Sequence, residues 1–387
     1  MKQSIKEVDV QGKRVLIRVD FNVPIQDGEI TDDKRIQMAL PTIQSVLDRG
    51  GKVTLISHLG RPSGVGFEEA FTLKPVAERL SELLEIEVGF DDSSLASVIL
   101  RENLRFDSRE KAGDEEFAAL LAEGFDIYCN DAFGTAHRNH ASMVAVPNQM
   151  EGKPRVAGLL LEKELKYLDE TIKHADAPFV AVLGGAKVSD KLGAIERLIG
   201  TVDTIVIGGA MAYTLLAAKG VSIGNSLVEK GLLEQSKEML ERADANGTKI
   251  QLSHDHVCAI EIADDAEIQI VNGDIPDGLI GLDIGPSTTA AFAETCRQAK
   301  TIVWNGPMGV FECEPFSFGT KGVAFAIAEA TLQGAVSIVG GGDSAAAISE
   351  FGLEMQMTHI STGGGASLQM LEGKDFLSVS LLDDTVS

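Results

Sequence analysis

The sequence has few cysteines, and their positions exclude the sites that cysteines usually build. There are four in 387 residues, far apart and with no CxxC pair: Cys129, Cys258, Cys296 and Cys313. Structural zinc sites need cysteines at short spacings, and disulfides are rare in reducing compartments. We therefore expect four reduced thiols, most of them buried.

Basic residues are outnumbered as well. The chain has 34 lysines and arginines against 58 aspartates and glutamates, which gives a net charge of −24. Binding to nucleic acid or to an anionic membrane surface requires a basic face on the protein. The composition therefore predicts that neither is a partner.

Long apolar runs are also missing. The first ten residues, MKQSIKEVDV, carry charges along their length and lack the apolar segment of a signal peptide. No uncharged run is long and apolar enough to cross a bilayer. We therefore expect a cytoplasmic protein and, because no extended apolar helix seam is visible, a monomer.

Several familiar active-site motifs do not occur: there is no GxxxxGK[ST] loop, no GxSxG elbow and no HExxH pair. Gly340, Gly342 and Ala345 do satisfy the GxGxxA pattern of dinucleotide-binding proteins, so a nicotinamide-dependent dehydrogenase is an alternative. Against it, the pattern lies near the end of the chain, and residues 359–362, which end the next apolar run, contain no acidic residue for a ribose diol.

What the sequence does contain is a recurring order of apolar run, glycine turn and helical pattern. Residues 336–339 are one such apolar run, followed by three glycines. The same order is found at the runs 179–183, 204–207, 301–304 and 359–362. Alternating strands and helices predict an α/β fold with a parallel, doubly wound sheet and a glycine-lined crevice at one edge.

The first half of the chain is rich in arginine instead. Eleven of the fourteen arginines lie before residue 166, although the whole chain is acidic. Ligands collect at the carboxyl ends of parallel strands, and guanidinium groups bind carboxylate and phosphate oxygens in pairs. Basic and polar side chains adjoin the apolar runs of this half: Asp20, Asn22, Arg35, His58, Arg61, Arg105 and Arg138. We predict that they hold a small, multiply charged anion.

The length predicts two domains, because one core rarely serves so long a chain. A helical pattern over residues 159–172 ends before Pro178, and arginine becomes scarce beyond it. We expect a domain over residues 1–165, a connecting helix and hinge over 166–178, a second domain over 179–373 and a tail over 374–387.

The glycine turns raise the question of what their polar residues do. Taken alone, Asp343 is an N-cap of the helix that follows, with Ser344 as its competitor, or else a carboxylate that faces a phosphate through a metal ion. Ser189 and Asp190 can cap another helix, so that Lys187 and Lys191 reach one anion over its N-terminus; the alternative is a solvated pair.

Residues after the run 301–304 carry a similar choice. Asn305 and Glu312 follow that run, and Glu312 either accepts ribose hydroxyls or is an ordinary exposed carboxylate.

Seven motifs together resemble the phosphoglycerate kinase family, in the family's order and over nearly the whole chain: RVDFNVP, SHLGRP, NDAFGTAHR, LGGAKVSDK, WNGPMGVFE, GGGDSAAA and STGGGAS. The resemblance implies two Rossmann-like domains, a tail that packs on the first of them, and the reversible transfer of the acyl phosphate of 1,3-bisphosphoglycerate to ADP in glycolysis. The products are 3-phosphoglycerate and ATP, and Mg²⁺ is the cofactor.

The resemblance also implies roles for matching residues. The seven polar and basic residues of the first half hold the glycerate ligand. Residues that line the adenosine slot or bind the nucleotide phosphates are Gly185, Ala186, Lys187, Lys191, Gly208, Gly209, Asn305, Gly341, Gly342, Asp343 and Ser344. Glu312 binds the ribose, Asp343 is on the side of the metal, and Gly363, Gly364 and Gly365 form a turn at the transition state. The family often has threonine at the position of Ser344, which keeps the hydroxyl.

This chemistry needs no general base. A carboxylate leaves in one direction and attacks, already deprotonated, in the other. The reaction needs in-line positioning and positive charge, which we expect from Arg35, Lys187, Mg²⁺ and the glycine-turn amides, each worth about 3 kcal/mol or more. It also needs water to be excluded, for which residues 163–173 and 363–365 are the expected moving parts.

Overall fold

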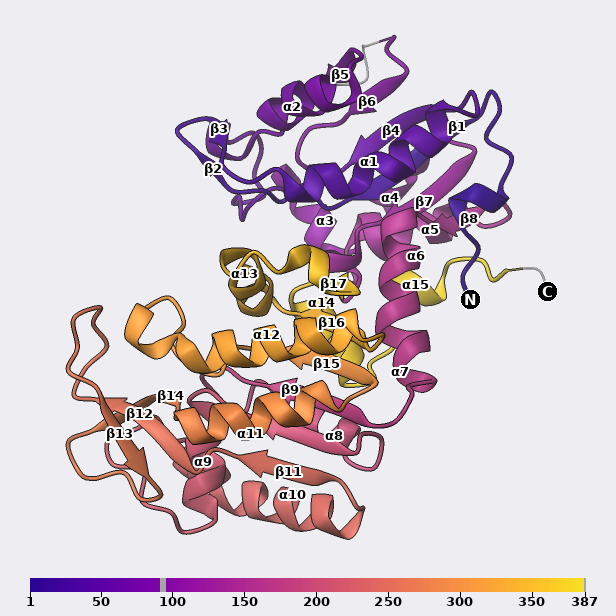
Figure 1. Ribbon diagram of the computed structural model, residues 1–387. Helices are drawn as coiled ribbons and strands as arrows, with labels where there is room; N and C mark the ends of the chain where they lie inside the picture. Colours follow the sequence, from indigo (N-terminus) through magenta and orange to yellow (C-terminus); the bar gives the residue numbers. More distant parts are fainter. Residues whose placement is uncertain (91–94, 386–387) are drawn as a thin grey trace. The chain divides into compact units, whose positions relative to one another are not determined.

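The computed structural model describes residues 1–90 and 95–385, and the chain divides into two compact units. The first unit consists of Met1–Lys166 and Asp375–Ser387, and the second of Tyr167–Lys374. Residues 386–387 of the predicted tail lie outside the described part. Each unit is built on a parallel sheet with helices on both faces, as predicted (Figure 1).

The sheet of the first unit has the strand order β5-β6-β4-β1-β7-β8, and all its pairs are parallel. From β1 the chain moves first to β4 on one side and later to β7 on the other. The carboxyl ends of β1 and β7 therefore flank the point where the winding reverses, which is where ligands bind in such sheets. The strands are β1 (Arg14–Val19), β4 (Lys52–Ile56), β5 (Val88–Phe90), β6 (Val98–Leu100), β7 (Ile127–Asp131) and β8 (Arg155–Ala157), and a small hairpin adds β2 (Ile25–Gln26) and β3 (Glu29–Ile30).

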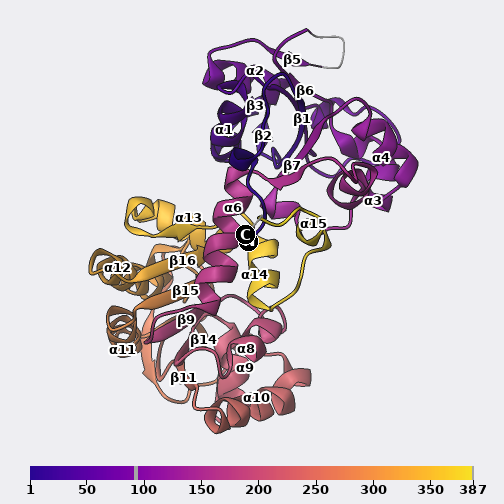
Figure 2. The same ribbon diagram turned by 90° about the vertical axis from the view of Figure 1, so that its right-hand side faces the viewer.

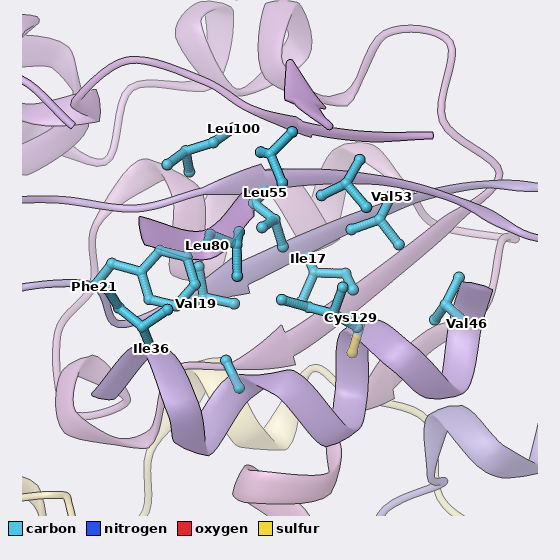
Figure 3. Close-up of a cluster of buried hydrophobic side chains, with 14 of the residues drawn as sticks. Ile17, Val19, Phe21, Ile36, Val46, Val53, Leu55, Leu80, Leu100 and Cys129 are labelled. Atoms are coloured by element: carbon cyan, nitrogen blue, oxygen red, sulfur yellow. The ribbon is translucent and has the colours of Figure 1, made fainter. Parts of the chain in front are cut away.

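Helix α1 packs on the sheet of the first unit through one apolar face. Its buried positions Ile36, Ala39, Ile43 and Val46 recur every three or four residues and so form one apolar face. Figure 3 shows Ile36 and Val46 turned toward the side chains of β1 and β4. The helices of this unit are α1 (Lys34–Leu47), α2 (Lys74–Leu84), α3 (Ser108–Ala112), α4 (Glu115–Ala122), α5 (Val146–Gln149), α6 (Leu159–Leu165) and α15 (Leu377–Ser380).

The helix predicted over residues 159–172 is present but irregular. Helix α6 continues through a π-helical turn, Lys166–Glu170, into α7 (Thr171–Lys173). A π-helical turn holds more residues than an α-helical turn and often marks a functional position. The two units divide within this segment.

The tail from Asp375 is part of the first unit. The Oγ of Ser378 donates a hydrogen bond to the carbonyl of Ala136 at 2.6 Å, and the Phe376 ring lies 6.3 Å from that of Phe133, centre to centre. At the chain's other end, the Nζ of Lys2 lies 2.9 Å from the Oδ1 of Asp384. These contacts hold residues 376–384 against the first sheet's unit.

The sheet of the second unit has the order β11-β10-β9-β15-β16-β17, again parallel throughout. Counted along the chain, this is the order 3-2-1-4-5-6, so the winding reverses between β9 and β15. All five predicted strands are confirmed. Its strands are β9 (Phe179–Leu183), β10 (Thr204–Ile207), β11 (Lys249–Leu252), β15 (Thr301–Asn305), β16 (Val336–Gly340) and β17 (His359–Ile360).

An antiparallel sheet with the order β13-β12-β14 also belongs to this unit, and the sequence analysis missed it. Its strands are β12 (Asp255–Ala259), β13 (Gln269–Asn272) and β14 (Ile280–Ile284). Strand β13 is largely exposed and so lacks the apolar run on which our strand predictions depended.

Helices lie on both faces of the parallel sheet of this unit. Figure 2 shows α11, α12 and α13 on one face and α8, α9 and α10 on the other. Trp304 of β15 and Ile327 of α12 are fully buried in the hydrophobic core that this sheet and its helices form. The helices are α8 (Leu192–Leu198), α9 (Met211–Ala218), α10 (Leu233–Ala245), α11 (Pro286–Arg297), α12 (Phe318–Leu332), α13 (Gly342–Glu350) and α14 (Gly365–Leu371).

Two further expectations concern thiols and membranes. All four cysteines are free; Cys129, Cys258 and Cys296 are buried and Cys313 is partly buried, as expected. No helix within the described residues has the length and apolar character needed to span a membrane.

Candidate functional site

The predicted anion-binding residues of the first unit follow its central strands. Asp20 comes directly after β1, and its Oδ2 accepts a hydrogen bond from the Nη1 of Arg35, in the first turn of α1, at 2.6 Å. Asn22 accepts from the amide of Gly60 at 2.8 Å, and the carbonyl of Gly60 accepts from the Nη1 of Arg105 at 2.7 Å. Two short networks thus connect the loop after β1 with α1 and with the loop after β4.

His58, which follows β4, is held as a neutral ring. Its Nδ1 lies 3.2 Å from the Nη2 of Arg18. Arginine can only donate, so Nδ1 accepts and the ring proton is on Nε2. The Oδ1 of Asp20 lies 3.9 Å from the same Nδ1, too far for a hydrogen bond. Burial, and to a lesser extent the positive charges of Arg18, Arg105 and Arg35, lower the pKa of His58 well below its ordinary value. This ring is a hydrogen-bond donor, and it adds no positive charge.

Positive charge is nevertheless concentrated here. Burial, together with the nearby guanidinium groups of Arg18 and Arg138, lowers the pKa of Arg105 to about 10. Arg138 and Arg61 are exposed, and neither has an ion-pair partner among the residues that the structure describes. Guanidinium groups that repel each other and lack partners are suited to bind an anion.

Arg18 is the residue of this cluster that the sequence analysis missed. It is fully buried in β1, where its Nε donates to the Oγ of Ser142 at 2.9 Å and its Nη1 donates to the carbonyl of Val19. An arginine inside the apolar run VLIRV was the available signal, because a charged side chain in a buried strand requires partners.

In the second unit, three glycine turns meet where the winding of the sheet reverses. A Cβ on Gly184 would lie 2.0 Å from the carbonyl oxygen of Pro307, and one on Gly209 would lie 2.6 Å from the amide nitrogen of Gly185. Gly209 also has a φ of 67°, which side chains disfavour. Only glycine permits these backbones to approach so closely. The predicted slot residues Gly185, Ala186, Gly208 and Gly209 all lie in these turns.

Lys191 and Asn305 come together beside these turns. The Nζ of Lys191 donates to the Oδ1 of Asn305. Asn305 is buried, and its Nδ2 has no hydrogen-bond partner in the described part of the chain. Burial lowers the pKa of Lys191, while the charges of Asp190 and Asp343 act against that shift. A lysine and a free amide donor next to close glycine turns are groups that can donate hydrogen bonds to phosphate oxygens.

The predicted caps of α8 are wrong. The helix begins at Leu192 with Lys191 itself as N-cap residue, and no side chain caps it. Ser189 instead donates from its amide and its hydroxyl to the carboxylate of Glu229, at 2.9 and 2.6 Å. Lys187 is exposed in the turn before it.

The cap prediction for α13 is wrong as well. The helix begins at Gly342, because Gly341 adopts a φ of 90° and serves as N-cap residue. Asp343 therefore lies in the first helical turn, exposed and with no hydrogen bond or ion pair within residues 1–90 and 95–385. Ser344 is buried and its Oγ accepts from the amide of Gly306 at 2.6 Å, which links α13 to the turn after β15. The carboxylate of Asp343 is thus available to a cation.

Four other predicted positions are placed without contacts that define a role. Glu312 is exposed after β15. Gly363, Gly364 and Gly365 lead into α14; Gly364 has a φ of 50°, and the amide of Gly363 donates to the Oγ of Ser361 at 3.1 Å.

The GxGxxA turn follows β16, the fifth strand of its sheet along the chain. A dinucleotide fingerprint follows the first strand. That position, after β9, is held by Gly184, Gly185, Ala186 and Lys187. The strand order therefore argues against the dehydrogenase alternative.

Two doubly wound units, one with clustered guanidinium groups and the other with close glycine turns, define the class of α/β phosphotransferases that act on small anions. Comparison with known proteins agrees. The model of the family described as "Phosphoglycerate kinase" matches residues 5–374. The chain belongs to the phosphoglycerate kinase family.

Relatives and solved structures cover the chain almost completely. Proteins named phosphoglycerate kinase from Rhodopirellula baltica and Thermosipho africanus are 54% and 52% identical to it, over 99% of both chains in the first case and over 98% of this chain and 97% of the other in the second. The phosphoglycerate kinase structure from Coxiella burnetii has a TM-score of 0.92 at 41% identity and covers 98% of each chain. That from Pyrococcus horikoshii OT3 has a TM-score of 0.81 at 31% identity and covers 99% of this chain and 98% of the other.

Membership of this family makes the chain a phosphotransferase of glycolysis that uses ATP or ADP as a substrate. The dehydrogenase alternative finds no support in any of these relatives.

Proposed function

We propose that this chain transfers the acyl phosphate of 1,3-bisphosphoglycerate to ADP, with the glycerate ligand held by the first unit and the nucleotide by the second. The observation that carries the assignment of the first unit is its cluster of mutually repelling guanidinium groups around His58. The glycerate ligands carry a phosphate and a carboxylate or acyl phosphate, which match such a cluster. The proposed ligand-binding residues are Asp20, Asn22, Arg35, His58, Arg61, Arg105 and Arg138.

The neutral state of His58 fits this chemistry. A carboxylate is the leaving group in one direction and the nucleophile in the other, so no side chain has to accept a proton. A ring with its proton on Nε2 can donate a hydrogen bond to a ligand oxygen without changing its charge. The positive charge that stabilises the transferred phosphoryl group then comes from Arg35 and Lys187. Asp20 orients Arg35 by accepting a hydrogen bond from its Nη1 at 2.6 Å.

On the nucleotide side, the glycine turns supply main-chain donors. Anions bind where backbone amides are unobstructed by side chains, and Gly185 has that property, since a Cβ built there would have no neighbour within 4 Å. Lys191 and the free Nδ2 of Asn305 are proposed to contact phosphate oxygens, and Glu312 the ribose.

A magnesium ion fits at Asp343. Its carboxylate is exposed and unpaired in the described chain, at the start of a helix that follows a glycine turn. The described residues contain no group of three or more His, Cys, Asp or Glu side chains arranged for a metal, so the phosphates of the nucleotide would complete the coordination. Magnesium in proteins is commonly held by one or two carboxylates together with substrate phosphates. When bound, the ion neutralises charge on the transferred group.

We further propose that the protein is a cytoplasmic monomer that does not bind nucleic acid. The net charge of −24 supports the last point, since binding to a phosphate backbone requires a basic face.

Calorimetric titration tests the assignment of one ligand to each unit. Wild type should bind 3-phosphoglycerate and ADP independently. Arg138→Ala should lose affinity for 3-phosphoglycerate and keep that for ADP, and Lys191→Ala should do the reverse, so each variant is the control for the other. Binding of NADH without binding of ADP would contradict the proposal.

A further inference from the structure

A buried chain of hydrogen bonds runs through the first unit and ends at His58. It begins at Glu110 of α3, whose carboxylate accepts from the amide and the hydroxyl of Ser142, at 2.9 and 2.6 Å. The same hydroxyl oxygen accepts from the Nε of Arg18 at 2.9 Å, and the Nη2 of Arg18 lies 3.2 Å from the Nδ1 of His58. Glu110, Ser142 and Arg18 are fully buried, and His58 is 4% exposed.

The direction of every bond in this chain is fixed. A carboxylate only accepts, so the hydroxyl proton of Ser142 points to Glu110, and its lone pairs are left for Arg18. Arg18 only donates, so His58 must accept at Nδ1. The bonds diverge from Arg18, which donates from Nε to Ser142 and from Nη2 to His58, while Ser142 passes its own proton on to Glu110. Arg18 thus determines which nitrogen of His58 carries the proton, and Glu110 and Ser142, up to three hydrogen bonds from the ring, determine where Arg18 lies.

Glu110 is needed for its negative charge as well as for its hydrogen bonds. A buried guanidinium is costly unless a negative group and good hydrogen bonds compensate it. Glu110 supplies the negative charge inside this cluster: it also acts favourably on the charge of Arg105, and its Oε1 lies 3.7 Å from the Nδ1 of His140. Arg18 has no exposed surface through which to meet a ligand itself.

We infer that Glu110 and Ser142 are positioning residues for the kinase reaction, which hold Arg18 so that His58 stays neutral with its proton on Nε2. The inference rests on the proposed contact of His58 with the glycerate ligand. It explains how a histidine can serve as a donor at any pH near neutrality. The charged and titratable groups that face the ring come from every element around it: Arg18 of β1, Asp20 after it, Arg35 of α1, Arg105 after β6 and His140 before α5.

Nitrogen NMR of the seven histidines tests the chain of bonds without any ligand. The His58 signals are assigned by their loss in His58→Gln. In wild type, we expect one protonated and one unprotonated ring nitrogen, with Nε2 protonated, from pH 5 to pH 8. In Ser142→Ala, Arg18 and Glu110 lose their shared partner, and we expect a mixture of tautomers. Glu110→Gln is the second variant: its amide donates to the hydroxyl, which turns the hydroxyl proton away, and it keeps the volume of the side chain.

Kinetics then test what the positioning is for. In both variants the KM for 3-phosphoglycerate should rise about tenfold while kcat changes less than about threefold, since ground-state binding is what weakens. Ser4→Ala is the matched control. It removes a hydroxyl that donates to the carboxylate of Glu162 at 2.7 Å in the same unit and should change neither the His58 spectrum nor KM.

Each outcome tests a different part of the inference. A wild-type His58 that is protonated on Nδ1, or charged at pH 7, overturns the inference even if no variant folds. A rise in KM with an unchanged His58 spectrum also overturns it, because the effect would then be a general loss of structure. A changed spectrum with an unchanged KM sustains the chain of bonds and overturns the proposed contact of His58 with the glycerate ligand.

Discussion

Arg35 combines a fixed anchor with free donors. One guanidinium nitrogen is bound to Asp20, and 36% of the side-chain surface is still accessible. A group that meets charge only as it develops lowers the barrier more than it strengthens substrate binding. Arg35→Ala should therefore reduce kcat by about 100-fold or more, with a smaller change in KM for 3-phosphoglycerate, as measured by steady-state kinetics.

The control is Arg79→Ala. Arg79 is another partly exposed arginine of the first unit, in α2, bound to Asp33 at 2.8 Å and to Glu82 at 2.6 Å. Its removal should leave kcat unchanged. Near-normal turnover in Arg35→Ala would show that Arg35 has no part in the transition state.

The sequence left two roles open for Asp343, a cap of helix α13 and a ligand of a metal ion, and a substitution distinguishes them. Because Gly341 caps α13, loss of the carboxylate should cost the helix little. Asp343→Asn should remove the Mg²⁺-dependent part of ADP affinity, measured by calorimetry with and without the ion, and change thermal stability only slightly. Equal Mg²⁺ dependence in wild type and variant would contradict a metal role.

Single residues also show what the sequence could not provide. The motif residues were found because glycine and arginine stand out after apolar runs. The caps of α8 and α13 were misplaced because the helix start depends on the φ of Gly341 and on the contact of Ser189 with Glu229, which is forty residues away in sequence. Arg18 was overlooked because burial, which gives it its importance, is a property of the folded sheet.

At the scale of elements, Asp131 joins strand β7 to helix α6. Its Oδ1 accepts from the amides of Leu160 and Leu161, at 2.9 and 3.2 Å, and so satisfies donors at the start of that helix. Burial raises its pKa from 3.8 to about 6. The folded state therefore binds this proton more tightly than the unfolded state, and stability falls as the pH rises from about 4 to about 6.

Asp131→Asn removes this titration while an amide oxygen can still accept. The free energy of unfolding of wild type minus that of the variant should fall by about 2 kcal/mol between pH 4 and pH 7 in denaturant titrations. A difference that does not vary with pH would show that Asp131 titrates normally.

Elements also differ in how well the sequence predicted them. Parallel strands buried on both faces appear as continuous apolar runs, and the turns after them carry glycine, so β9, β10, β15, β16 and β17 could be predicted; β11, at the edge of the same sheet, was missed. Strand β13 of the antiparallel sheet could not be predicted, because it is mostly exposed and so gives no buried apolar run.

For the whole molecule, the division into two units falls at the π-helical turn Lys166–Glu170. We expect bending in this segment when both substrates bind, because the transferred group must be shielded from water. Small-angle scattering with 3-phosphoglycerate and a non-hydrolysable ATP analogue should give a smaller radius of gyration than the free protein or either binary complex. Equal radii in all four states would exclude a large closure.

The central claim is that the clustered guanidinium groups and the glycine turns serve one phosphoryl transfer. A coupled assay that follows ATP-dependent phosphorylation of 3-phosphoglycerate, with Mg²⁺ and with GTP in parallel, tests it most directly. We predict Mg²⁺-dependent turnover by wild type and by Arg79→Ala, and at least about 100-fold less by Arg35→Ala. Folded wild-type protein that binds both ligands but yields no 1,3-bisphosphoglycerate would contradict the account.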